Sequence, residues 1–229
     1  TVKKTRLSDF SNPRKAGIIA VDLDEGDCLV GAAITDGKHD VMLFSDAGKA
    51  VRFDENDVRP MGRTARGVRG MNLGEGQEVI AMLVAPAEIS EEASMSTDTT
   101  ANDAPSSVLT ATENGFGKRT PIVEYTRHGR GTKGMIAIQT SERNGKVVAA
   151  ALVSPEDQIM LITTGGVLVR TRVSEIREMG RSTQGVTLIN VDEGTHLSGL
   201  QRIAESDSDD DADELGEESD NLSESSGDA

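Results

Sequence analysis

The sequence predicts an all-β protein built from repeated four-stranded units. Three segments, 41–67, 108–134 and 159–185, align without a gap over 27 residues, and each keeps the same spacing of glycine, arginine and a Gly-Arg pair. Short apolar runs flank glycine-containing turns in every copy. Four such strands in a unit of about 50 residues are typical of a blade in a radial β array. A helical solenoid is excluded because no apolar period of 3.6 residues is sustained.

The first element expected is a partial blade at residues 1–40. Its stretch "PRKAGIIAVDLDEGDCLVGAAI" is similar to the second half of a complete unit, with Gly17 in the place of Gly67. The chain therefore begins inside a repeat, and together with Thr1 in the first position this indicates a fragment. Cys28 has no second cysteine to pair with, and we expect it to be a small buried residue.

Residues 41–84, 108–153 and 154–204 are expected to form three complete blades, which gives about three and a half repeats in the chain. Each complete blade is predicted to consist of two β-hairpins. The hairpin turns share a glycine that can supply the positive φ of a tight turn, at Gly48, Gly76, Gly115, Gly145, Gly166 and Gly194.

The formal net charge of −15 is an average over unlike segments. Residues 205–229 contain twelve acids and no base, and residues 85–107 contain five acids and no base. Both stretches are poor in large apolar residues, so we expect an acidic inter-blade insertion and an acidic tail that are disordered. Without them, 22 acids face 24 bases, and the body of the chain is slightly basic.

The basic residues are concentrated in the connections between the two hairpins of each repeat. Equivalent positions of a radial array lie on one face, so these cations are expected to follow one curved edge that suits a bent DNA duplex. Arg63, Arg130 and Arg181 recur in register, which favours phosphate binding over simple solubility. The predicted DNA-binding residues are Lys3, Lys4, Arg14, Lys15, Arg59, Arg63, Arg66, Arg69, Lys118, Arg119, Arg127, Arg130, Lys133, Arg172, Arg177 and Arg181.

Other kinds of site are not supported. Residues 129–134 match G-x-G-x-x-G, but they lie between strands with no helix after them, so dinucleotide binding is not expected. Tyr125 aligns with Val58 and Ile176, which predicts a packing role rather than a nucleophile. The three histidines share no spacing, so no metal site, cofactor site or catalytic constellation is predicted. The sequence also lacks an apolar run long enough for a membrane span, and we expect a cytoplasmic protein.

Several stretches carry a family resemblance. "GRTARGVRG", "ENGFGKRT", "EYTRHGRGTKG" and "RTRVSEIREMGRSTQGV" resemble the C-terminal domain of the DNA gyrase A protein, in order, over about residues 1–204. The resemblance implies a β-pinwheel that bends or wraps duplex DNA, as the non-catalytic part of an ATP-dependent type II topoisomerase that introduces negative supercoils. It further implies a place at the bacterial nucleoid, with the gyrase B protein, ATP and Mg²⁺ engaged by the rest of the enzyme.

Two alternatives stay open at this point. The glutamine-arginine-glycine-lysine box of the first gyrase blade is absent, which leaves the corresponding C-terminal domain of topoisomerase IV possible. A β-propeller-like scaffold whose arginines meet acidic partner proteins would explain the same basic connections. The acidic tail is expected either to contact the basic edge in cis and compete with DNA, or to act only as a solubilising segment.

Overall fold

The computed structural model describes residues 1–87 and 107–203. The strands are β1 (His39–Ser45), β2 (Lys49–Asp54), β3 (Val79–Pro86), β4 (Ser107–Thr112), β5 (Phe116–Pro121), β6 (Met135–Ile136), β7 (Val147–Val153), β8 (Gln158–Thr163), β9 (Leu168–Arg172), β10 (Val186–Thr187) and β11 (Leu197–Ile203). Short 3₁₀ helices are η1 (Leu7–Phe10), η2 (Glu55–Asp57), η4 (Ile122–Glu124) and η5 (Val173–Glu175). Within the described ranges, no helix is long and apolar enough to cross a membrane.

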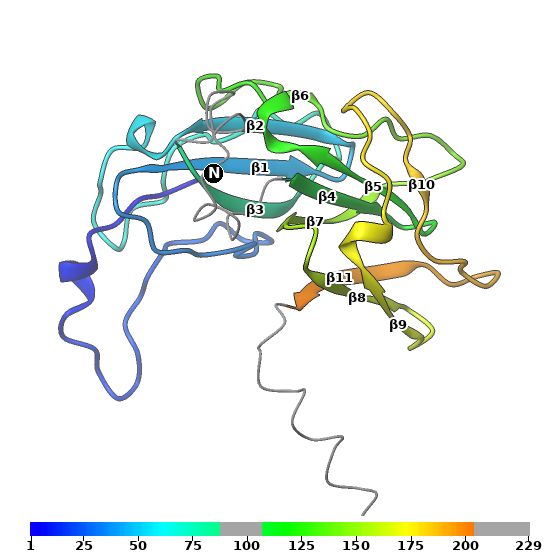
Figure 1. Cartoon of the computed structure of the whole chain (residues 1–229). Helices are drawn as coiled ribbons and strands as arrows, with labels where there is room; N and C mark the ends of the chain where they lie inside the picture. The colour runs from blue at the N-terminus through cyan, green and yellow to red at the C-terminus, as the bar shows by residue number, and fades with distance from the viewer. Residues whose placement is uncertain (88–106, 204–229) are drawn as a thin grey trace, which may run out of the picture.

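The strands form three antiparallel sheets, and the all-β prediction is confirmed (Figure 1). Their strand orders are β3-β1-β2-β6, β7-β4-β5-β10 and β11-β8-β9. Each sheet contains one tight β-hairpin, formed by β1 and β2, by β4 and β5, or by β8 and β9. The sequence predicts the acidic insertion at residues 85–107, but residues 85 and 86 belong to β3 and residue 107 belongs to β4. The predicted insertion is therefore too long by two residues at its start and one at its end. The rest of it, and the acidic tail, lie outside the described residues.

The prediction of a second hairpin in each repeat is wrong. Strand β6 follows β5 in the chain but pairs with β2 of the preceding sheet, and β10 pairs with β5 in the same way. The two arms of the predicted hairpin therefore belong to different sheets. Gly134 gives the physical reason for this exchange of strands. It has a φ of +76°, and a Cβ atom at this position would lie only 2.5 Å from the carbonyl oxygen of Ala50. Glycine lets the chain approach the neighbouring sheet closely enough to exchange a strand.

The hydrophobic core lies between consecutive sheets rather than within one of them. Met42 and Phe44 of the first sheet pack with Val108 of the second, and Leu109 of the second packs with Leu161 of the third. Because the middle sheet is covered on both faces, every residue of β4 is buried, instead of every second one.

Tyr125 belongs to this core, as the sequence predicts. Its side chain is fully buried, and its ring meets that of Phe44 edge to face with centroids 6.0 Å apart. Burial raises the pKa of the Tyr125 hydroxyl, so the residue has the packing role that its alignment with Val58 and Ile176 indicates.

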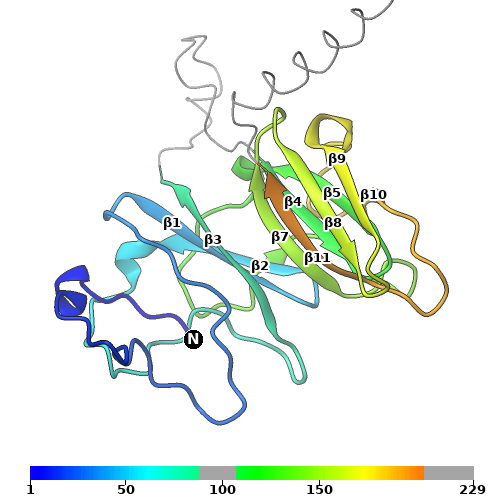
Figure 2. The ribbon, with the colours of Figure 1, turned by 90° about the horizontal axis from the view of Figure 1, so that it is seen from below.

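The N-terminal repeat is joined to the first sheet by its opening residues. Val2 forms an antiparallel bridge with Val68, and Lys4 forms a parallel bridge with Pro60. Residues 11–38 contain no helix or strand and lie along one side of the molecule (Figure 2). Cys28 lies in this stretch and is exposed, so the prediction that it is buried is wrong. The segment has no described partner strand to cover it.

Candidate nucleic-acid interface

The predicted DNA-binding residues fall into structurally different groups. The first consists of Lys4 and Arg119, which occupy the repeat position held by Arg52 in the first sheet. Arg52 donates to the carbonyl oxygens of Ile122 and Tyr125, at the two ends of η4, both at 3.1 Å. Arg119 donates in the same way to the carbonyl after η5, at 2.8 Å, and the Lys4 ammonium lies 3.5 Å from the first carbonyl of η2. These cations hold each repeat to the next.

Lys3 and Lys118 form a second group at the neighbouring repeat position. The Lys118 side chain is 0% exposed, and its ammonium donates to the carbonyls of Gly180 at 2.5 Å and Arg181 at 2.6 Å. Burial is the main cause that lowers the pKa of Lys118 to about 8, and the nearby Arg181 acts in the same direction. Because no phosphate can reach a fully buried ammonium, the prediction that Lys118 contacts DNA is wrong. Lys3 donates to the equivalent carbonyl of Arg63, and burial lowers its pKa as well.

The three arginines that recur in register have a structural role that the sequence does not reveal. Each donates to the backbone carbonyl at the same position of the preceding repeat: Arg63 to Ile19 at 2.7 Å, Arg130 to Arg69 at 3.1 Å and Arg181 to Ile136 at 3.2 Å. This repeated hydrogen bond is sufficient to explain the register. A carbonyl does not neutralise a guanidinium, so the positive charges remain near the surface.

A further group is neutralised by carboxylates. Arg127 lies 2.7 Å from the buried carboxylate of Asp40, which also pairs with Arg52 at 2.7 Å. Arg66 is paired with two acids of the N-terminal repeat, the nearer being Asp24 at 2.5 Å. The stretch "VDLDEGD", with four acids in seven residues, is the sequence signal that could have indicated this pairing.

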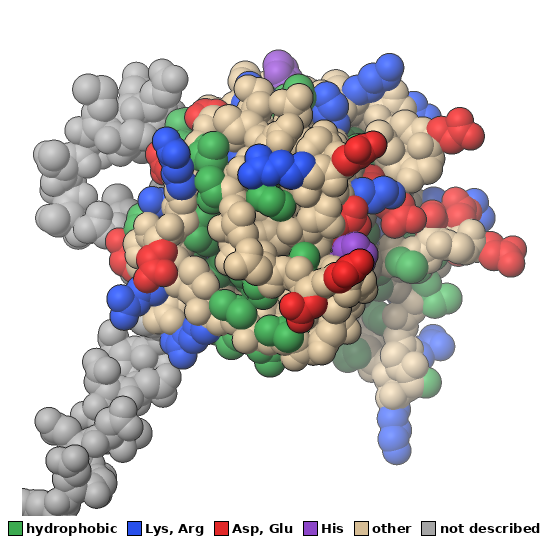
Figure 3. Space-filling model, turned by 90° about the vertical axis from the view of Figure 1, so that its right-hand side faces the viewer, with side chains coloured by type: hydrophobic (Ala, Val, Ile, Leu, Met, Phe, Trp, Pro, Cys, Tyr) green, Lys and Arg blue, Asp and Glu red, His purple; other side chains and the backbone are tan. Residues whose placement is uncertain are grey.

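Seven predicted residues remain, which we call the unpaired set. All seven are exposed, and within the described residues their side chains make no hydrogen bond or ion pair: Arg14, Lys15, Arg59, Arg69, Lys133, Arg172 and Arg177. Arg59 and Arg177 occupy the same position of two repeats, and Lys133 occupies that of Arg66. One face of the molecule shows Lys and Arg side chains spaced apart, with acidic side chains among them (Figure 3). Spaced cations of this kind suit contacts with successive phosphates better than one compact anion.

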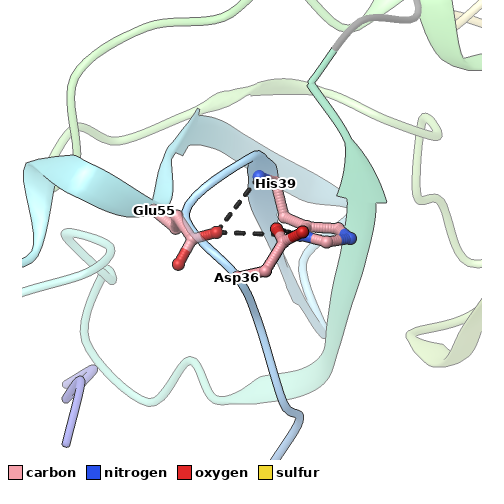
Figure 4. Close-up of side chains that lie close together, drawn as sticks. All are labelled: Asp36, His39 and Glu55. Carbon is pink, nitrogen blue, oxygen red and sulfur yellow. Dashed lines mark hydrogen bonds and ion pairs between the residues drawn. The ribbon is translucent and has the colours of Figure 1, made fainter. Parts of the chain in front are cut away.

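One group of possible metal ligands was not predicted. Asp36, His39 and Glu55 converge from the segment before β1, from β1 and from η2 (Figure 4). His39 Nδ1 lies 2.9 Å from Asp36 Oδ1 and 3.7 Å from Glu55 Oε1. However, the Glu55 carboxylate already accepts from the Thr35 hydroxyl and two backbone N–H groups, and pairs with the Lys4 ammonium at 3.0 Å. Burial works to raise the pKa of Glu55, but these partners outweigh it and lower the pKa to about 2. The Glu55 carboxylate thus has a structural role, because it joins η2 to Lys4 and to the segment before β1.

Comparison with known proteins decides the family. The model of the DNA gyrase C-terminal domain, described as a beta-propeller, matches residues 1–36, 39–86, 106–154 and 157–204. The chain belongs to the DNA gyrase C-terminal domain family. It is 51% identical over 213 residues to the DNA gyrase A protein of Pseudomonas aeruginosa, covering 93% of the chain and 21% of that protein. It is 47% identical over 215 residues to the Escherichia coli gyrase A protein, covering 94% and 23%. The chain thus spans about a fifth to a quarter of the length of these gyrase relatives.

Solved structures of this gyrase family share the β-pinwheel fold. A DNA gyrase A C-terminal domain matches with a TM-score of 0.69 and 27% identity, over 83% of this chain and 59% of that one. A C-terminal domain of DNA topoisomerase IV matches with a TM-score of 0.75 over 88% and 58%, but at 24% identity it supports the fold alone. The gyrase A resemblance drawn from the sequence is therefore confirmed, and the gyrase lineage is favoured over topoisomerase IV.

Proposed function

We propose that this chain binds duplex DNA through the unpaired set and bends or wraps it along the edge of the blade array, as part of the gyrase A protein. The observation that supports this is the presence of seven exposed cations that have no intramolecular partner among the described residues. Six of them lie on connections outside the strands, and Arg172 is the last residue of β9. Contact with phosphates would release counterions and would depend little on base sequence. In this proposal Lys4, Arg52, Arg119 and Lys118 hold the blades in place while the unpaired set meets DNA.

The form of nucleic acid also follows from the side chains. Single-strand binders stack bases on exposed aromatic rings. Here Phe44, Phe53 and Tyr125 are buried in the core. Phe116 is only partly buried, but its ring is covered by the Arg143 guanidinium at 4.6 Å from the centroid. A backbone-contacting mode on duplex DNA is the better fit.

The remainder of the proposal concerns the whole enzyme. Bending of DNA by this domain would present a duplex segment for strand passage, giving negative supercoils in the bacterial cytoplasm. The gyrase B protein, ATP and Mg²⁺ would act through parts of the enzyme outside this chain, and we assign them no residue here. The acidic tail, in this proposal, competes with DNA for the unpaired set. Deleting residues 205–229 should then strengthen DNA binding at low salt, and equal affinity would leave the tail a solubilising segment.

A pair of matched variants tests the DNA-binding proposal. Changing Arg59 and Lys133 to Gln removes two unpaired charges, whereas changing Arg66 and Arg127 to Gln removes two charges that carboxylates already neutralise. Both variants alter the net charge equally. The slope of log affinity against log salt should fall by about 0.9 per lost phosphate contact, so by about 1.8 in the first variant and little in the second.

The result also separates DNA binding from a protein-interaction scaffold. If neither variant changes the slope, or if the chain does not bind a long duplex at low salt, the proposal fails. In that case the basic connections would serve an acidic protein partner instead.

A further inference from the structure

Three basic connections occupy equivalent positions in the blades. They are residues 59–67, 126–134 and 177–185, which we call the first, middle and third connections. The first connection begins with Arg59 and the third with Arg177, and both arginines belong to the unpaired set. The middle connection begins with Thr126 instead, and Lys133 near its end is its one member of the unpaired set. The start of the middle connection therefore lacks the cation that its two equivalents have.

A histidine lies near the start of the middle connection. His128 occupies the repeat position of Met61 in the first connection and of Met179 in the third. Its backbone N–H donates to the Arg52 carbonyl at 2.8 Å, and the N–H groups of the two methionines donate to the equivalent carbonyls at 2.9 Å. The backbone is thus held in the same way in all three connections. His128 differs from its equivalents because its side chain can gain a positive charge.

The His128 side chain is accessible to a ligand. It is exposed, and within the described ranges it makes no hydrogen bond or ion pair. A Cβ atom on the adjacent Gly129 would meet nothing within 4 Å, so this part of the connection is open to its surroundings.

The acids near the middle connection have other partners. The charged side chains of this connection, and of the ends of β1, β2 and η2 that it contacts, are Asp40, Arg52, Asp54, Glu55, Asp57, Arg127, Arg130 and Lys133. Arg52 and Arg127 share the Asp40 carboxylate at 2.7 Å each, and Asp54 lies 3.6 Å from Arg127. No carboxylate of the described residues pairs with His128. A positive charge on this imidazole is therefore not neutralised within the described part of the chain.

The other two histidines of the sequence have different surroundings. His39 Nδ1 lies 2.9 Å from the Asp36 carboxylate and 3.7 Å from that of Glu55, so acids would neutralise a proton bound there. His196 is exposed like His128, but it lies in the turn before β11 and outside the three connections. Its backbone N–H donates to the Thr164 hydroxyl at 3.0 Å. His128 is thus the histidine that combines an exposed imidazole with a basic connection.

We propose that protonated His128 contacts a phosphate of duplex DNA, so that the middle connection gains a DNA contact as the pH falls. This inference rests on the DNA-binding function proposed above. An unperturbed imidazole changes charge at about pH 6.5, and a nearby phosphate favours the charged form. DNA binding therefore takes up a proton from the solvent. The methionines at the equivalent positions do not titrate, so the response to pH belongs to the middle connection.

Three substitutions in the 229-residue chain test the proposal. His128→Gln removes the titratable group, and His128→Lys keeps a positive charge throughout. His196→Gln is the control, because it removes an equally exposed imidazole outside the connections. The affinity for a long duplex is measured against salt at about pH 6 and about pH 7.5, on either side of the pH at which an imidazole ordinarily titrates.

The slope of log affinity against log salt gives the number of phosphate contacts. For the wild-type chain and the control, this slope should be steeper at the lower pH by up to about 0.9, the value for one phosphate. His128→Gln should keep the shallower slope at both pH values, and His128→Lys the steeper one. Calorimetry in two buffers of different ionisation enthalpy measures the proton directly: uptake on DNA binding should be smaller for His128→Gln than for the wild-type chain.

Two results would overturn this inference and leave DNA binding itself in place. The first is a salt slope of the wild-type chain that does not change with pH. The second is a change with pH that is equal in the wild-type chain and in His128→Gln. A chain that binds no duplex at either pH would overturn the DNA-binding proposal together with this one.

Discussion

Replacing Lys118 by Met is expected to remove a large pH-dependent part of the free energy of unfolding. The buried ammonium has a pKa of about 8, against 10.5 for an exposed lysine. The difference of about 2.5 units corresponds to about 3 kcal/mol, at about 1.36 kcal/mol per unit. Between these two values the folded chain binds fewer protons than the unfolded chain, so stability rises as the pH rises from 8 to 10.5. At neutral pH, burial of the charged Lys118 therefore lowers the unfolding free energy of the wild-type chain by most of this amount.

Urea denaturation at about pH 7 and about pH 9.5 measures the effect. The difference in unfolding free energy between wild type and Lys118→Met should shift by about 2 kcal/mol in favour of wild type at the higher pH. The raised pKa of Tyr125 lowers stability at high pH in both chains, and so cancels in the comparison. If the unfolding free energies of the two chains change with pH in parallel, Lys118 is not a buried ammonium with a lowered pKa, and this assignment is refuted.

Three further predictions concern the contacts between blades. Asp40→Ala leaves the buried Arg52 without its carboxylate and should cost about 3–5 kcal/mol in urea unfolding. Gly48→Ala should destabilise the chain by at least about 2 kcal/mol more than Gly76→Ala, because only the Cβ atom at position 48 would collide with a carbonyl oxygen, that of Ile138. Similar urea midpoints for the two variants would argue against strand exchange. Glu55 has a pKa of about 2, so its carboxylate contributes stability above pH 4.5 that is lost as the pH falls towards 2. Glu55→Gln should therefore flatten this part of an acid titration followed by circular dichroism. An unchanged titration profile would contradict this role of Glu55.

The repeat pattern in the sequence predicts much of the fold. The glycines at 48, 115 and 166 mark the central hairpin turns, and the alignment of Tyr125 with Val58 and Ile176 places it in the core. The pairing of β6 and β10 with a preceding sheet could not be predicted from one repeat. Alternation and turn residues specify a strand and its turn, but they do not specify which of two neighbouring sheets supplies the partner edge.

The candidate interface was predictable only as a region. Charge and spacing locate the basic connections, but they do not distinguish Lys118, whose ammonium is buried on two carbonyls, from Lys133, which is exposed. Arg66 and Lys133 hold the same repeat position, yet only Arg66 meets acids, which come from residues more than forty positions away. Long-range partners of this kind depend on the tertiary fold and leave little signal in a local segment.

The topology of a DNA circle tests the central claim most directly. The wild-type chain would be bound to a relaxed plasmid, treated with a nicking-closing enzyme and removed, and the linking number of the plasmid would then be compared with that of plasmid treated alone. We predict a shift that grows with the amount of wild-type chain and is lost when the seven residues of the unpaired set are changed to Gln. Arg66 and Arg127 changed to Gln should leave the shift in place. An unchanged linking number with the wild-type chain bound, or an equal shift with the seven-residue variant, would contradict DNA bending by the unpaired set.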